Sequence, residues 1–65
     1  MIGFTVRYEY ERTEYVGVII DKYYINNYGR YNIMRSDDDG TVDLPTLVDS
    51  VYCTSIISVI KINKE

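Results

Sequence analysis

Apolar and polar side chains alternate with a period of two at the start of the chain. The apolar positions are Ile2, Phe4, Val6, Tyr8 and Tyr10, and between and after them stand Gly3, Thr5, Arg7, Glu9 and Glu11. Successive side chains of a β-strand point to opposite faces of the sheet, so this spacing predicts a strand with one buried face and one face in water.

The side chains available for a core also favour a β fold. Of the 65 residues, 46% are hydrophobic, and the aromatic ones are eight Tyr and one Phe with no Trp. Ile and Val are abundant and Ala is absent. β-Branched and aromatic residues suit the half-buried surface of a sheet, whereas helices favour Ala, Leu, Glu and Lys. A chain of this length has room for one core, so we expect residues 1–65 to form a single all-β domain.

Further strands are predicted from apolar runs that lie between turn residues. These runs are Tyr15–Ile25, Tyr31–Arg35, Thr41–Leu44 and Ser55–Ile62. Gly17 interrupts the first run and predicts a bend, a bulge or a close approach of two backbones. Asn26–Gly29 predicts a hairpin connection, since Asn and Gly tolerate positive φ.

Two segments in the second half of the chain need separate interpretation. Ser36–Gly40 predicts a tight acidic turn in which Gly40 has positive φ. Thr46–Thr54 fits either a strand or a short helical turn, because its apolar residues have helix-like spacing and Pro45 suits the first turn of a helix.

This succession of elements resembles the SH3-like and Sm-like small β-barrels, a group that includes KOW and Tudor-type modules. The resemblance is carried by Tyr15–Asp21, Tyr31–Met34 and Asp39–Gly40, which give the cadence V-G-V-I, Y-x-I and D-G. It implies a single five-stranded antiparallel SH3-like barrel with one short helical turn. Small barrels of this kind serve unrelated functions, so the resemblance implies a fold and no particular activity.

The residue types needed for catalysis or metal binding are scarce. The chain has no His, which is the commonest transition-metal ligand and neutral-pH proton carrier, and its single Cys53 excludes an internal disulfide. Residues 37–41 match the D-x-D-G-T loop of haloacid-dehalogenase-type phosphotransferases, but that chemistry requires a doubly wound sheet more than twice this length. We interpret them as a solvated turn, and we expect no enzymatic activity, no cofactor and no metal.

Charge and hydropathy restrict the partners and the location. The net charge of −3 disfavours binding to a phosphate backbone, which requires clustered Lys and Arg. No segment approaches the ~20 apolar residues of a membrane span, and no signal-peptide pattern is visible. A lone Cys fits a reducing compartment. We therefore expect a cytoplasmic protein that does not enter membranes.

The eight tyrosines are too many for so small a core. We expect two or three of them, Tyr8, Tyr31 and Tyr52, to lie in the core or at its edge. Tyrosines near the hairpin should point outward, and Tyr is frequent in binding hot spots because it offers a large contact area at low entropic cost. The candidate partner-binding residues are Tyr23, Tyr24, Tyr28 and Arg30 with the acidic residues Asp37, Asp38 and Asp39.

Three hypotheses about function follow from these patterns. The leading one is a non-catalytic protein-binding module, an adaptor or inhibitor encoded by a phage or another mobile element, which acts on a host protein through its Tyr-rich and acidic surface. The alternative is a KOW- or Sm-like nucleic-acid binder that uses Arg7, Arg30 and the tyrosines. The third is a ring-forming homo-oligomer that binds small nucleotides between subunits, because an open edge strand permits pairing with another copy.

Overall fold

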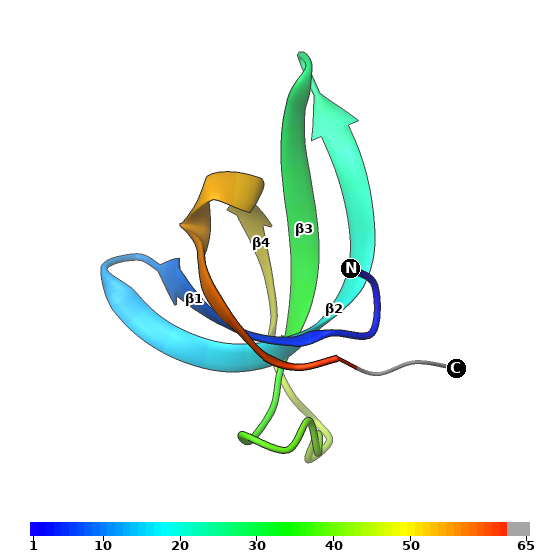
Figure 1. The fold of residues 1–65 in the computed structure, drawn as a ribbon, viewed down its shortest axis with the longest axis vertical. Helices are drawn as coiled ribbons and strands as arrows, with labels where there is room; N and C mark the ends of the chain where they lie inside the picture. Colours follow the sequence, from blue (N-terminus) through cyan, green and yellow to red (C-terminus); the bar gives the residue numbers. More distant parts are fainter. Residues whose placement is uncertain (63–65) are drawn as a thin grey trace.

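Five antiparallel strands form one sheet in the computed structural model, which describes residues 1–62 (Figure 1). The strands are β1 (Thr5–Tyr10), β2 (Thr13–Ile25), β3 (Tyr28–Arg35), β4 (Val48–Tyr52) and β5 (Ile56–Lys61), and a 3-10 turn, η1 (Cys53–Ser55), joins the last two. Their order in the sheet is β4-β3-β2-β1-β5. The predicted all-β fold with five antiparallel strands and one short helical turn is confirmed. Across this part of the chain, no helix has the length and apolar character to cross a membrane.

Two-residue turns join the first three strands. Asn26 and Asn27 have φ values of 50° and 69°, and Glu11 and Arg12 have 51° and 67°. Positive φ at both central residues is typical of the type I′ turn, whose twist matches that of the flanking strands. The hairpin predicted at Asn26–Gly29 is confirmed, although Tyr28 and Gly29 already pair within β3. The Glu-Arg turn has no Asn or Gly to reveal it in the sequence.

The prediction of a strand at Thr41–Leu44 is wrong. These residues belong to the connection between β3 and β4, where the backbone of Asp37 donates to the carbonyl of Thr41 at 3.0 Å instead of joining the sheet. The fourth strand is β4, inside the ambiguous segment Thr46–Thr54, and the helical turn follows it as η1. Asp49 occupies a buried position of β4 and breaks the apolar alternation, which hid the strand in the sequence.

The sheet curls until β1 and β4 face each other across the interior, where the Tyr8 hydroxyl donates to Asp49 at 2.7 Å. The buried hydrophobic core consists of Val6, Tyr8, Ile19, Tyr31, Ile33 and Val51. Gly17 permits the curl: a Cβ there would lie 2.6 Å from Ile33 Cγ2 and from the carbonyl oxygen of Met34. The close approach predicted at Gly17 is confirmed.

The first strand keeps most of its predicted alternation. Val6 and Tyr8 are fully buried, whereas Ile2 is 61% exposed and precedes β1. Thr5 was expected on the wet face but is fully buried, opposite Val18 on β2 and Lys61 on β5, whereas Arg7 on the same face is exposed as expected.

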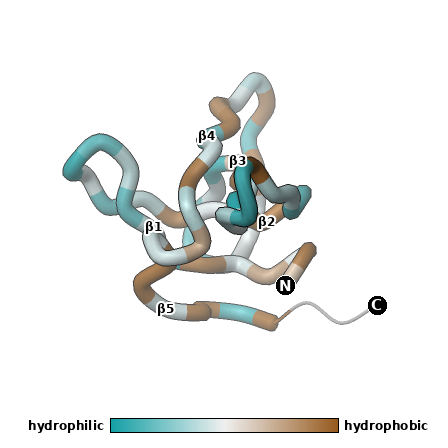
Figure 2. Tube along the Cα trace, turned by 90° about the horizontal axis from the view of Figure 1, so that it is seen from above, coloured by the Kyte–Doolittle hydropathy of each residue, from teal (hydrophilic) through white to brown (hydrophobic). Residues whose placement is uncertain are grey.

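The described pairing ends at β4 on one side and at β5 on the other. Closure into an SH3-like barrel therefore remains a prediction. Apolar residues continue along β5, and the β1–β2 turn is hydrophilic (Figure 2). Ile57, Val59 and Ile60 of this edge strand are exposed.

Candidate functional site

Tyr23, Arg30 and Tyr52 form a row across three neighbouring strands. Tyr23 of β2 lies opposite Arg30 of β3, and Arg30 lies opposite Tyr52 of β4. Directly opposed residues of antiparallel strands share a face of the sheet, and so do residues two apart in one strand, which places Tyr28 on the same face. We call Tyr23, Tyr28, Arg30 and Tyr52 the arginine–tyrosine patch.

Side-chain contacts hold this patch in one arrangement. The guanidinium carbon of Arg30 lies 4.4 Å from the centroid of the Tyr52 ring, and its Nη2 donates to the carbonyl oxygen of Ser50 at 3.0 Å. The rings of Tyr28 and Tyr52 meet edge to face, with centroids 6.4 Å apart. The Tyr23 hydroxyl hydrogen-bonds the Ser50 hydroxyl. Tyr28 and Tyr52 nevertheless remain 66% and 50% exposed.

The structure corrects one of the three tyrosines expected in the core or at its edge. Tyr8 and Tyr31 are buried as predicted, but Tyr52 is half exposed and belongs to the patch. The reason is the pleat of β4: Asp49 and Val51 point inward, so Tyr52 must point outward. In the sequence, the alternation of Ser50 and Tyr52 with Asp49 and Val51 would predict an outward Tyr52, but only once the segment is known to be a strand.

The candidate residues divide between the two faces of the sheet. Tyr24 lies opposite Gly29, one position out of step with Tyr28, and so points to the other face. There the Lys22 ammonium lies 5.4 Å from the centroid of the Tyr24 ring and 5.7 Å from that of Tyr31. Of the predicted binding residues, Tyr23, Tyr28 and Arg30 are therefore brought together, and Tyr24 is not.

The acidic turn lies at the opposite end of β3 from the patch. Its carboxylates bond within the turn: the Thr41 amide donates to Asp37 Oδ1 at 2.9 Å, and the Thr41 hydroxyl donates to Asp39 Oδ1 at 2.6 Å. Hydrogen bonding to Asp37 and Thr41 holds the pKa of Asp39 at about 2, and the bond that the two carboxyls share raises the pKa of Asp37. Gly40 has φ of 88°, which confirms the predicted turn. The structure does not bring Asp37, Asp38 and Asp39 to the tyrosines.

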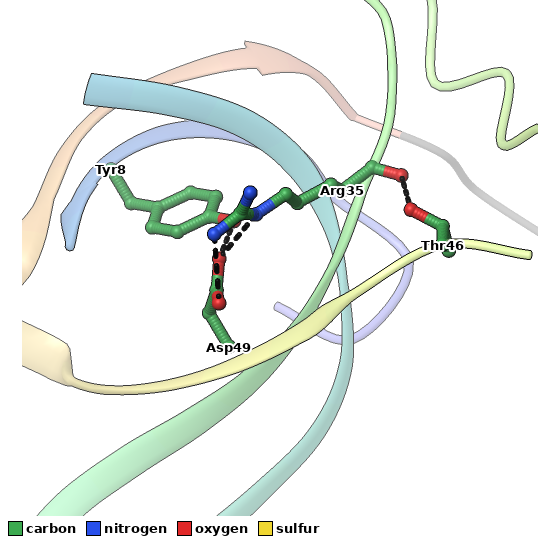
Figure 3. A network of polar contacts seen from close by, with 4 residues as sticks. All are labelled: Tyr8, Arg35, Thr46 and Asp49. Atoms are coloured by element: carbon green, nitrogen blue, oxygen red, sulfur yellow. Dashed lines mark hydrogen bonds and ion pairs between the residues drawn. The ribbon is translucent and has the colours of Figure 1, made fainter. Parts of the chain in front are cut away.

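A second polar cluster lies inside the curled sheet (Figure 3). Arg35 Nε donates to Asp49 Oδ2 at 2.8 Å, Arg35 Nη2 donates to Asp49 Oδ1 at 3.2 Å, and the Tyr8 hydroxyl donates to Oδ2 as well. The guanidinium carbon of Arg35 also lies 3.9 Å from the centroid of the Tyr15 ring. Burial, together with the bond to Asp49, raises the pKa of Tyr8. The cluster joins β1, β2, β3 and β4, and we interpret it as a structural brace.

Two hollows flank Tyr52, one on the outer face of the sheet and one at the edge of β4. One, of about 290 Å³, is lined by Tyr28, Tyr52 and Thr54. The other, of about 280 Å³, runs along β4 and is lined by residues of the patch, of β4 and of the β1–β2 turn. Together they make Tyr52 the ridge between two concave surfaces that a partner could fill.

Comparison with known protein families, characterised proteins and solved structures finds no match for this chain. Among residues 1–62, no three His, Cys, Asp or Glu side chains gather closely enough to hold a metal ion. The arginine–tyrosine patch, whose side chains contact one another and remain accessible, is the candidate site that the chain's own geometry supports best.

Proposed function

We propose that this protein is a non-catalytic protein-binding module and that the arginine–tyrosine patch is its contact surface. The observation that carries the proposal is that Tyr28 and Tyr52 are largely exposed and yet held edge to face, with Arg30 stacked on Tyr52. Side chains that are already ordered lose little conformational entropy when a partner covers them. Tyr and Arg are also the residue types most frequent in hot spots of protein interfaces.

Protein binding is better supported than nucleic-acid binding. Arg30 already donates to Ser50, and Arg35 is paired with Asp49 inside the sheet. The hollow beside the patch holds one further cation, Arg12, and two carboxylates, Glu9 and Glu11. A surface that binds phosphates needs several unpaired cations at one place, so a module acting as an adaptor or inhibitor of a larger protein fits this surface better.

The test compares exposed tyrosines on opposite faces. Tyr28 and Tyr24 are both 66% exposed and lie close together in the β2–β3 hairpin, but only Tyr28 belongs to the patch. A protein captured by the immobilised chain would be purified and titrated by calorimetry. We expect Tyr28→Ser and Tyr52→Ser to weaken binding by at least about tenfold. Tyr24→Ser should bind like the unaltered chain, and thermal melting should confirm that all three variants fold.

Three results would contradict the proposal. The first is equal affinity of all variants for the captured protein. The second is stronger weakening by Tyr24→Ser than by Tyr28→Ser, which would place the contact on the other face. The third is retardation of DNA or RNA that salt abolishes and Tyr52→Ser removes, which would favour the nucleic-acid alternative.

A further inference from the structure

On β4, the register with β3 decides which backbone N–H and C=O groups point away from the sheet. The Arg35 amide donates to the carbonyl of Leu47 at 3.1 Å, and the register continues from there with Met34 opposite Val48. Hydrogen-bonded and non-hydrogen-bonded pairs alternate along antiparallel strands. Val48 and Ser50 therefore direct their N–H and C=O groups away from β3, toward the edge at which the sheet order ends. The N–H of Tyr52 points the same way, whereas its C=O belongs to the first bond of η1.

Arg30 occupies one of these free positions. It crosses over Tyr52 and donates from Nη2 to the outward-pointing carbonyl of Ser50 at 3.0 Å. The Nε atom of the same guanidinium is buried and has no hydrogen-bond partner within the described chain. Unpaired groups along an edge strand form a template for another strand. The guanidinium thus stands where the main-chain N–H of an added strand would stand.

The hollow along this edge has two chemically different walls. Its inner wall includes Tyr10 and Val51, which belong to the core or pack against it, and its outer wall includes Arg30 and Tyr52. Side chains of an extended segment point alternately to the two faces of a sheet. A strand placed here would direct alternate side chains toward the apolar inner wall and the others toward the guanidinium.

We propose that this slot binds an extended segment of a partner protein, which adds to β4 as a further strand and presents apolar residues to Val51 and a carboxylate to Arg30. The proposal rests on the proposed function and names the class of partner. A main-chain N–H of the segment replaces Arg30 at the Ser50 carbonyl, and Arg30 then pairs with the carboxylate in the bidentate geometry that guanidinium groups favour. Glu9, Glu11 and Arg12 also line the slot near the β1–β2 turn. Because the two glutamates outweigh the charge of Arg12, a single carboxylate is expected rather than an acidic run.

The two edge strands of a second copy do not supply such a segment. One of them, β5, contains no Asp or Glu and ends in Lys61. The pairing of β5 with β1 also shifts register twice, and bulges of this kind disfavour strand addition. In β4 itself, the one carboxylate belongs to Asp49 and is engaged by Arg35 and Tyr8.

The experiment uses random octapeptides displayed on phage and selected against the full chain. Enriched peptides should alternate apolar residues around one Asp or Glu. Arg30→Gln should lower the affinity for a selected peptide by about tenfold or more. It should have little effect on the affinity for the same peptide when the acidic residue is changed to its amide. Arg7→Gln is the control, because Arg7 is an exposed arginine of β1 that does not line the slot. Hydrogen exchange of the Ser50 and Tyr52 amides should slow when peptide binds.

Several outcomes would overturn the proposal. They are no enriched peptide, enriched peptides without a carboxylate, and binding that leaves exchange at Ser50 and Tyr52 unchanged. Slower exchange at these amides on raising the concentration of the chain alone would instead assign the slot to a second copy. Suppose that Tyr28→Ser and Tyr52→Ser weaken the binding of a captured protein, but that this binding leaves hydrogen exchange at the two amides unchanged. The proposal of strand addition then fails and the proposed function stands. If the tyrosine variants also bind normally, both fail.

Discussion

Replacing Arg35 by Leu should destabilise the fold more than any other single change in the polar brace. Asp49 is 5% exposed and accepts hydrogen bonds from Arg35 Nε, Arg35 Nη2 and the Tyr8 hydroxyl. Arg35→Leu removes the first two of these bonds together with the only positive charge that faces the carboxylate within the brace. The variant therefore leaves a buried, negatively charged Asp49 with one neutral donor.

The size of the effect follows from this arrangement. Removing one partner of a buried ion pair costs about 3–5 kcal/mol, because the remaining charge is neither solvated nor paired. The Arg35 side chain is 27% exposed, so water screens the pair in part and we expect the lower end, about 3 kcal/mol. Asp49→Asn should cost less, about 1–2 kcal/mol, since Tyr8 can still donate to the amide oxygen and Arg35 can reach water.

The assay is urea unfolding followed by tyrosine fluorescence and circular dichroism, with osmolyte added equally to all samples to keep weak variants folded. The sharpest comparison is the double variant Arg35→Leu/Asp49→Asn, which no longer buries an unpaired charge. It should be more stable than Arg35→Leu alone by at least about 1 kcal/mol. Arg7→Leu, a change at an exposed arginine, should lie within about 0.5 kcal/mol of the unaltered chain. The reasoning is refuted if Arg35→Leu has no larger effect than this control, or if adding Asp49→Asn lowers stability further.

Three other variants test separate features of the fold. The pKa of Tyr8 is raised in the folded state, so the unfolded chain loses this proton first and stability should fall as pH rises above about 10. In Tyr8→Phe, the free energy of unfolding should fall less steeply with pH, by up to about 1.4 kcal/mol per pH unit. Urea titrations at alkaline pH that give the same slope for both chains would contradict this expectation. Gly17→Ala should lower the free energy of unfolding by about 1–3 kcal/mol, because its Cβ would lie 2.6 Å from Ile33 Cγ2 and the Met34 carbonyl; an unchanged urea midpoint would show that the two strands can separate freely there. Gly40→Val should cost at least about 1 kcal/mol, since φ at this position is 88°, and an unaltered melting temperature would mean that the turn adjusts without strain.

Local patterns were sufficient where a segment's own residues set its conformation. The alternation around Val6 and Tyr8 predicted β1, and Asn26-Asn27 predicted the hairpin, because side-chain period and tolerance of positive φ are properties of the residues themselves. The acidic turn with Gly40 was predicted for the same reason. The positive φ values of Glu11 and Arg12 were not predicted, since neither residue favours them and the pairing of β1 with β2 imposes them.

The sequence predicted only part of the candidate site. Exposed tyrosines around the hairpin were predicted from their number, which exceeds what a small core can hold, and Tyr23, Tyr28 and Arg30 do share one face. Tyr52 was expected in the core or at its edge, and its outward direction was not visible while Thr46–Thr54 fitted either a strand or a helical turn. Asp49 interrupts the apolar alternation of that strand, and Arg35 and Tyr8 pair with its buried carboxylate.

By itself, the sequence determined that this chain is a sheet of antiparallel strands rich in tyrosine, because β-branched and aromatic residues at period two have few other low-energy arrangements. The tertiary structure alone decided which tyrosines lie together on one face of the sheet. Sharing a face depends on strand register, and register is fixed by the buried Arg35–Asp49 pair, by the bulge between Ile19 and Asp21 and by the close approach at Gly17. Each of these joins residues of different strands. A local pattern such as the glycine at position 17 can suggest a close approach, but it cannot say which residues of the neighbouring strand lie opposite.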